Sequence, residues 1–268
     1  FVNEQARLPG SPFKIIPGMW TLTFSLESNL SLYQGVKNET DLEMRKLLRN
    51  FDFRKAISHA IDREAVARML VPGPMLRALP SGFPSGADYY DPEAVVSYSY
   101  DPEKSKELLA GLEFKDTDGD GILNWTSGPL QGQNLTVAVK IHEDQTACVD
   151  IVEALVPMFE KVGIRLTPKI VKSTVGQALD TAGEFELNMT RQDFLASPYT
   201  SLTSLAPVTP SSPNWHRAGP GEKRDLLPFE ERMVEIVEAL KYERTREGRQ
   251  ELFSELQKLW TENLYTIG

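Results

Sequence analysis

The chain has 268 residues, 41% of them hydrophobic and 25% charged, which is typical of a globular protein with a substantial core. The formal net charge is −9 at pH 7, so the surface repels phosphate backbones and nucleic acid is a poor partner. No run of about 18 apolar residues occurs, so the sequence predicts no transmembrane helix. No basic segment followed by an apolar one occurs near Phe1, so we find no signal peptide, and we expect chain to be missing at both ends.

The first part of the chain predicts one strand followed by helices. Residues 19–26 are rich in β-branched and aromatic side chains and read as a strand. Residues 42–70 have a helical pattern that is interrupted once, and Asp62 is placed to cap the second helical segment. Asp101 followed by proline begins a further short helix, and we expect Gly111 to end it at the position after the cap.

The middle of the chain alternates strands and helices. In chain order we predict a strand over 135–141, a helix over 144–162, a strand over 164–171, a helix over 174–182 and a strand over 185–190. The first three elements form a βαβ unit, which implies a parallel pair of strands. Gly163 should stop the first helix, and Pro157 should kink it or remove one of its hydrogen bonds. After a loop over 195–228, two amphipathic helices close the chain, so the pattern as a whole indicates an α/β fold.

Motifs of enzymes are missing from the sequence. The three histidines lie far apart, and no HExxH, P-loop or G-x-S-x-G pattern occurs. The single cysteine, Cys148, falls in an apolar helical pattern and is interpreted as a buried structural thiol. Carboxylates are plentiful, but no pair of them is selected by its spacing, so we do not expect an enzyme.

The segment 116–121 is an acidic turn that resembles part of a metal-binding loop. Asp116, Asp118 and Asp120 alternate and are followed by Gly121, which matches the first half of a calcium-binding EF-hand loop. The twelfth position of that loop is Ser127, which lacks the carboxylate that completes such a site. The sequence therefore leaves two alternatives, a calcium site and a tight turn whose side chains bond the local backbone. We expect no cofactor, with calcium as the alternative.

Several aromatic residues fall in or beside predicted loops. They are Trp20, Tyr89, Tyr90, Tyr98, Tyr100, Tyr199 and Trp215. Each of them can pack against its own loop, because aromatic rings are costly to leave in water. As a group they suit a ligand cleft, which combines apolar walls with a few polar groups. Trp20 and Trp215 are therefore candidate ligand-binding residues.

Four stretches, taken in order, resemble the family 5 extracellular solute-binding proteins, which take up oligopeptides, dipeptides and nickel. The stretches are FRKAISHAIDRE at 53–64, YDPEKSKELL at 100–109 followed by DTDGDG at 116–121, FEKVGI at 159–164 and RQELFSELQKLW at 249–260. The resemblance implies a periplasmic-binding-protein-like lobe with a mixed, mostly parallel sheet flanked by helices. It also implies that residues 1–268 form a single ligand-binding lobe and that the first lobe of a two-lobed protein is absent.

The resemblance further implies the substrate-binding component of an ABC importer. Such a protein is expected outside the cytoplasm, as a monomer, with a peptide-like or other small polar ligand and a membrane permease as partners. Family members hold ligand with an acidic and an aromatic residue after the strand that corresponds to 185–190. Asp193 and Phe194 match that pair, and Arg191 offers a site for an anion or carboxylate. The tryptophan that members often show there is missing.

Two other classes of function remain open. One is a hydrolase that uses carboxylates or a metal held by the Asp116–Asp120 loop. The other is a structural or signalling module that kept the fold and lost its ligand, which the missing tryptophan keeps open. The presence of bound metal separates the first from a binding protein, and an intact partner permease argues against the second.

Overall fold

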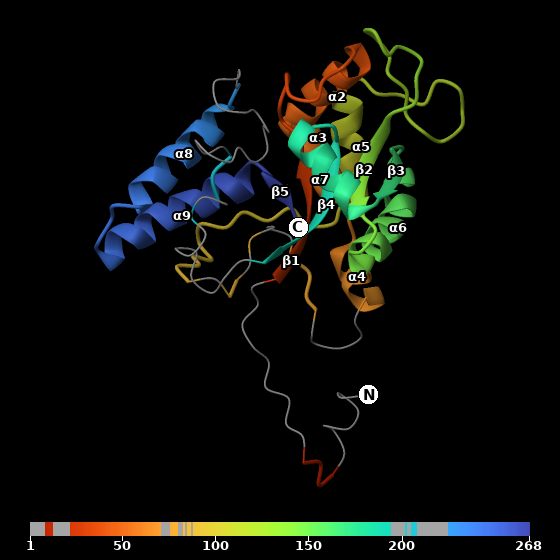
Figure 1. Cartoon of the computed structure of the whole chain (residues 1–268). Helices are drawn as coiled ribbons and strands as arrows, with labels where there is room; N and C mark the ends of the chain where they lie inside the picture. The colour runs from red at the N-terminus through yellow and green to blue at the C-terminus, as the bar shows by residue number, and fades with distance from the viewer. Residues whose placement is uncertain are drawn as a thin grey trace.

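The fold was obtained as a computed structural model, which describes residues 9–12, 22–70, 76–79, 83, 85–86, 88–193, 202, 205–207 and 225–268. Its centre is a five-stranded sheet with the order β3-β2-β4-β1-β5 (Figure 1). The strands are β1 (Leu22–Ser28), β2 (Thr136–His142), β3 (Arg165–Val171), β4 (Leu187–Asp193) and β5 (Thr266–Ile267).

The sheet is mixed, as the family resemblance implies. β2 is parallel to β3 and to β4, whereas β1 is antiparallel to both of its neighbours, β4 and β5. Four strands therefore run in one direction and β1 runs against them. The predicted βαβ unit is confirmed as β2, α6 and β3, because a crossover helix is what allows two successive strands to lie parallel.

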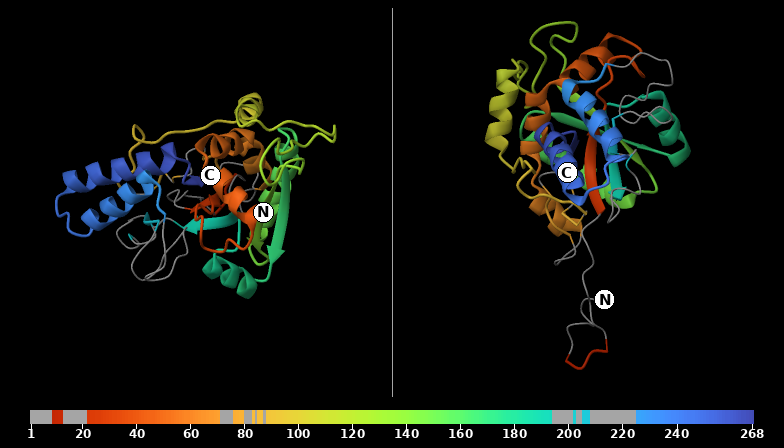
Figure 2. Two further views of the ribbon diagram at one scale, coloured as in Figure 1. Left: turned by 90° about the horizontal axis from the view of Figure 1, so that it is seen from above. Right: turned by 90° about the vertical axis from the view of Figure 1, so that its left-hand side faces the viewer.

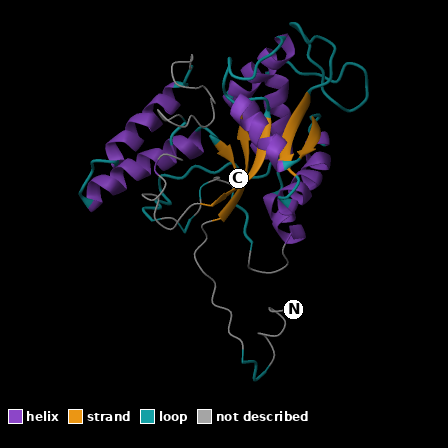
Figure 3. Ribbon diagram, in the orientation of Figure 1, coloured by secondary structure: helices purple, strands orange, loops and turns teal. Residues whose placement is uncertain are grey.

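Helices flank the sheet on both faces (Figure 3). They are α2 (Glu39–Arg49), α3 (Phe51–Ala60), α4 (Arg63–Leu70), α5 (Pro102–Gly111), α6 (Thr146–Glu160), α7 (Ser173–Ala182), α8 (Pro228–Leu240) and α9 (Arg246–Glu262). The helical pattern predicted over 42–70 divides into three helices, because Asn50 and Asp62 both act as caps. The Asn50 side chain accepts from the N–H of Asp52, and the Asp62 carboxylate accepts from the N–H of Ala65 at 2.9 Å. No helix in the described part of the chain is long and apolar enough to cross a membrane.

The end of α5 differs from the prediction. Gly111 is the last helical residue, Leu112 is the cap, and the left-handed position falls on Glu113, whose φ is 67°. The N–H of the buried Phe114 donates to the carbonyl of Leu109, so the chain turns two residues later than the glycine suggests. At the end of α6, in contrast, Gly163 has a φ of 84°, and a Cβ there would lie 2.6 Å from Cγ of Leu123. Glycine is required at this second position.

Pro157 does not end α6. The helix continues to Glu160, and the N–H of Lys161 donates to the carbonyl of Pro157. Pro157 is exposed, so the hydrogen bond that its missing N–H removes lies on the solvent side of the helix.

Two hydrophobic cores lie side by side. The first packs the sheet against α3 and α6 and includes Phe53, Val139 and Phe159. The second lies between α8 and α9 and includes Met233 and Trp260. Figure 2 shows α8 and α9 extending away from the sheet as a pair. The assignment of residues 1–268 to a single lobe stays a prediction.

A buried arginine joins the two cores. Arg54 in α3 is 1% exposed, and its guanidinium donates to the carbonyls of Leu48 and Arg49 at the end of α2, each at 2.8 Å. It also donates to the carbonyl of Asn263, the C-cap of α9, at 3.1 and 3.2 Å. Burial lowers the pKa of Arg54 to about 10, which leaves it charged at neutral pH. The ends of two helices thus share one cation, which the helix dipole favours at carboxyl ends.

Candidate functional site

The carboxyl ends of β2, β3, β4 and β5 meet at one edge of the sheet. Because β1 runs in the opposite direction, its first residue, Leu22, lies at this same edge, opposite Asp193. In open α/β sheets, ligands bind in the crevice outside the carboxyl ends of the strands. This edge is therefore the candidate ligand site of the chain.

Two of the predicted ligand-binding residues lie at this edge. Arg191 is exposed and pairs with Phe24 across β4 and β1, and Asp193 is the last residue of β4. The sequence predicts the end of this strand at Thr190, so both residues were expected in the following loop. β4 continues to Asp193 because its last three residues pair with residues 22–24 of β1, a partner 160 or more positions away. The other candidates, Trp20, Phe194 and Trp215, lie outside the described residues.

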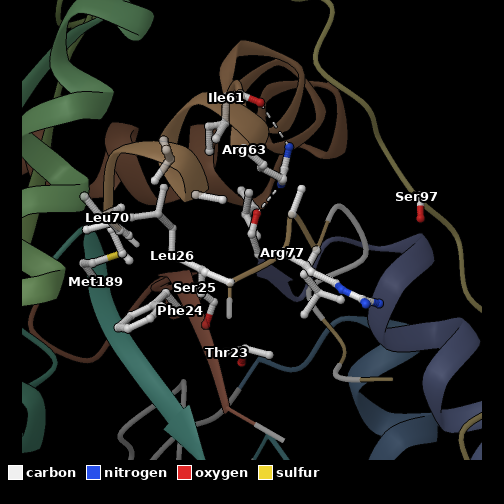
Figure 4. A pocket seen from close by; sticks show the side chains of 18 of the residues that line it. Thr23, Phe24, Ser25, Leu26, Ile61, Arg63, Leu70, Arg77, Ser97 and Met189 are labelled. Atoms are coloured by element: carbon white, nitrogen blue, oxygen red, sulfur yellow. Dashed lines mark hydrogen bonds between the residues drawn. The ribbon is translucent and has the colours of Figure 1, made fainter. Parts of the chain in front are cut away.

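A cavity of about 360 Å³ opens beside this edge (Figure 4). One wall is residues 23–26 of β1 with Met189 of β4, and another is formed by α4 and α6. The segment 76–79 and Tyr90 close the cavity from a third direction. Phe24, Leu26 and Met189 lie on one side in Figure 4, and Arg77 lies on the opposite side. The walls are mostly apolar with a few polar groups, which is usual for small-molecule sites.

The charged side chains that line the described part of the cavity are both arginines, Arg63 and Arg77. The Arg63 guanidinium donates to the carbonyl and the hydroxyl of Ser58, at 3.0 and 2.9 Å, and to the carbonyl of Gly268. Burial lowers its pKa to about 10. Arg63 thus fixes the end of β5 against α3 and α4, and no Asp or Glu side chain is among the described residues that line the cavity.

The loop aromatic residues that the structure describes do not form one cluster. Tyr89 stacks on Phe253 of α9, with ring centroids 5.2 Å apart, and Tyr98 packs edge-on against Phe51. For these two residues, loop packing is the correct interpretation. Tyr90 lines the cavity, and Tyr100 is 41% exposed. Tyr199 lies outside the described residues.

Sequence reasoning missed Phe24 and Arg63 as residues of the cavity, whereas Tyr90 was among the aromatic residues expected to suit a cleft. Phe24 had a detectable signal, because alternation along β1 places it on the same face as the buried Leu26. Arg63 had none, because its neighbours at the cavity come from distant segments.

The acidic turn bonds its own backbone. One carboxylate oxygen from each of Asp116, Asp118 and Asp120 lies within 4.8 Å of the others, and all three residues are exposed. Asp116 accepts from the N–H groups of Gly119 and Gly121 at 2.7 and 3.1 Å. Asp120 accepts from the guanidinium of Arg165 at 3.1 Å, and its hydrogen bonds lower its pKa. These contacts fit the tight-turn alternative, and a calcium site here stays a prediction.

Cys148 and His142 are of reactive residue types, but each of them is packed within the fold. Cys148 is buried, and burial raises its pKa to about 11, so the thiol stays protonated at neutral pH. His142 lies under α7, where its Nε2 is 3.1 Å from Nζ of Lys140 and 3.4 Å from Asp180. A Cβ on Gly176 would lie 2.5 Å from that nitrogen, so α7 rests directly on the imidazole ring.

Comparison with known proteins agrees with this architecture. Residues 2–214 match the family described as bacterial extracellular solute-binding proteins, family 5 Middle. The periplasmic alpha-galactoside-binding protein of Rhizobium meliloti is 31% identical over 267 residues, covering 99% of this chain and 38% of that protein. The oligopeptide-binding protein AppA of Bacillus subtilis is 27% identical over 130 residues, covering 48% of this chain and 23% of that protein.

Solved structures extend the likeness to the fold. The periplasmic binding protein MelB of Agrobacterium fabrum, in complex with stachyose, superposes with a TM-score of 0.90 at 33% identity, covering 99% of this chain and 40% of that one. An oligopeptide-binding protein OppA superposes with a TM-score of 0.77 at 20% identity, covering 93% and 41%. The chain spans about two fifths of the length of the relatives that it matches along its whole length. The chain has the fold of periplasmic binding proteins and belongs to the family 5 bacterial extracellular solute-binding proteins.

Proposed function

We propose that the chain is a ligand-binding lobe of a solute-binding protein that captures neutral oligosaccharides of the α-galactoside class for an ABC importer. The observation that carries this proposal is the likeness, along 99% of the chain and at 31% and 33% identity, to two proteins whose names or complexes specify such sugars. The protein would act outside the cytoplasm as a monomer, with a membrane permease as its partner. Capture would need no bond-making, since closure around a ligand suffices.

The charges at the cavity support an uncharged ligand. A peptide carries an ammonium group, and burying a charge without a partner is costly. The described residues of the lining offer two arginine side chains and no Asp or Glu side chain, so no described side chain there is a counter-ion for that group. A sugar brings only hydroxyl groups and apolar C–H faces, which suit apolar walls with a few hydrogen-bonding groups.

One observation favours peptides as a second candidate ligand. β1 pairs with β5 only at Leu26 and Glu27, so in the described structure residues 22–25 have a strand neighbour on one side alone. Three of these residues, Thr23, Phe24 and Ser25, also line the cavity. An extended peptide can add to such an edge through main-chain hydrogen bonds. AppA and other relatives of the chain are peptide-binding proteins by name.

The two candidates are separated by calorimetry on the full-length, two-lobed protein. Stachyose and raffinose are titrated in one series and a mixture of tri- to pentapeptides in another. We expect saturable binding of the galactosides with a Kd in the micromolar range or below, and no heat from the peptides. Peptide binding without sugar binding would replace the first proposal with the second. Binding of neither would favour a structural or signalling module.

Two controls address the remaining alternatives. Chromatography of stachyose after incubation with the protein should recover it intact, whereas release of galactose would favour the hydrolase alternative. The 268-residue chain alone should bind at least tenfold more weakly than the two-lobed protein, because contacts from only one lobe remain.

A further inference from the structure

We infer that Phe24 is the aromatic platform on which this lobe receives one sugar ring, and that Arg191 beside it donates hydrogen bonds to the hydroxyl groups of that ring. The inference rests on the proposed function and names the residues that would carry it. Phe24 has no role in the family resemblance, and its placement follows from the sheet register and the cavity alone.

The register places the two side chains together. Phe24 of β1 lies directly opposite Arg191 of β4, and residues directly opposite in an antiparallel pair share one face, with Cβ atoms about 4.5–5.5 Å apart. The preceding pair on that face is Leu26 with Met189, which are 2% and 3% exposed. Phe24 is half-buried and Arg191 is exposed. This pair is therefore the first on its face to emerge from the core at the carboxyl edge.

The cavity gives the ring of Phe24 a ligand-sized space. Phe24 packs against the hydrophobic core and also lines the cavity of about 360 Å³ (Figure 4). A pyranose ring has an apolar C–H face, which stacks on an aromatic ring, and an edge of hydroxyl groups. The guanidinium of arginine is planar, always charged and carries five donors, so it serves neighbouring hydroxyl groups at once. Phe24 lines the cavity, and Arg191, its register partner on the same face of the sheet, stands at the rim of that face, so the two residue types match the two surfaces of one sugar unit.

Charge at the cavity also selects the ligand. The charged side chains among the described residues that line the cavity, Arg63 and Arg77, are both positive, which disfavours a cationic group there. Neutral hydroxyl groups accept from arginine without a charged partner of their own. The cavity therefore suits a neutral sugar better than a peptide amino terminus.

The test uses substitutions in the full-length, two-lobed protein and calorimetric titration with stachyose. Phe24→Leu keeps an apolar side chain and removes the ring face, and Phe24→Tyr keeps the ring. Phe51→Leu is the matched control, because Phe51 is also a partly buried ring packed against the same core but does not line the cavity. Arg191→Gln removes the guanidinium. Melting temperatures of all variants are measured in the absence of sugar.

We expect Phe24→Leu to weaken stachyose binding by at least about tenfold and Arg191→Gln by about fivefold, since aromatic contacts and charge-assisted hydrogen bonds are of this size. Phe24→Tyr and Phe51→Leu should stay within about threefold of the unmodified protein. Binding by Phe24→Leu within twofold of the unmodified protein would overturn the inference while leaving the proposed function intact. Failure of the unmodified protein to bind any galactoside would instead overturn the proposed function.

Discussion

Replacing Arg54 tests how the α8–α9 pair is fastened to the sheet. Arg54 is 1% exposed and donates to three carbonyls, those of Leu48, Arg49 and Asn263. Arg54→Met keeps an unbranched apolar chain of about the length of the arginine stem but removes the guanidinium and all of its donors. The contact with the carbonyl of Leu48 is buried and those with the carbonyls of Arg49 and Asn263 are partly buried, so these acceptors lose a partner that water replaces at best incompletely.

The magnitude follows from those acceptors. A buried acceptor left without a partner costs about 1–3 kcal/mol and a partly buried one less, so the three together cost roughly 3 kcal/mol. The variant no longer buries a cation, which offsets a part of that cost. We therefore expect Arg54→Met to lower the free energy of unfolding by about 2–3 kcal/mol. For a chain of this size, that corresponds to a fall in melting temperature of about 4–10 °C.

The assay is urea unfolding at pH 7 followed by circular dichroism, with thermal melting as a second measurement. The control is Arg68→Met, since the side chain of Arg68 is 70% exposed and lies 4.0 Å from Glu64. Exposed pairs contribute little, so this control should remain within about 0.5 kcal/mol of the unmodified chain. If Arg54→Met lost less than about 1 kcal/mol, the carbonyl contacts would not hold the two cores together and the reasoning would be refuted.

Three further predictions concern single sites. Gly176→Ala should destabilise the chain by about 1–2 kcal/mol, because the added Cβ would lie 2.5 Å from Nε2 of His142. Gly111→Ala has open space at its Cβ and should stabilise the chain by about 0.5–1 kcal/mol. Equal effects of the two substitutions in thermal melts would contradict this prediction. Burial raises the pKa of Glu186, so this carboxylate takes up its proton at a higher pH in the folded state than in the unfolded state. Lowering the pH toward 4.5 should therefore stabilise the unmodified chain relative to the Glu186→Gln variant. If the difference in unfolding free energy between the two proteins did not change with pH, it would be inconsistent with this sign. Calcium at about 2 mM should shift the melting temperature by less than about 1 °C, and a larger rise that Asp118→Asn abolishes would establish a calcium site instead.

Local chemistry explains why much of the fold was predictable. The N-caps at Asp62 and Asp101 and the helix stop at Gly163 each depend on residues within about four positions, so the sequence alone determines them. The same holds for the alternation that predicts β2, α6 and β3. Where a local rule failed, as at Gly111, a tertiary contact competed with it, since burial of Phe114 moved the turn by two residues.

The ligand site was predictable only in part. The family resemblance pointed to Asp193, and the chemistry of its side chain pointed to Arg191; both residues lie at the carboxyl edge of the sheet, and their contact with ligand stays a prediction. The resemblance could not identify Phe24, because the place of that ring in the cavity wall depends on the pairing of β1 with β4 and on walls from α4 and segment 76–79. A sequence pattern reports which face of a strand is apolar but not which segment lies opposite it.

The sequence by itself determined the class of the molecule: an acidic α/β chain, its helix ends, its βαβ unit and its likeness to solute-binding proteins. Only the tertiary structure decided that β1 lies between β4 and β5, that Arg54 reaches a carbonyl 209 positions away, and that a cavity forms at the carboxyl edge. The physical reason is that capping and periodicity act within a few residues. Strand pairing and cavity walls, in contrast, depend on which distant surfaces bury the most apolar area together.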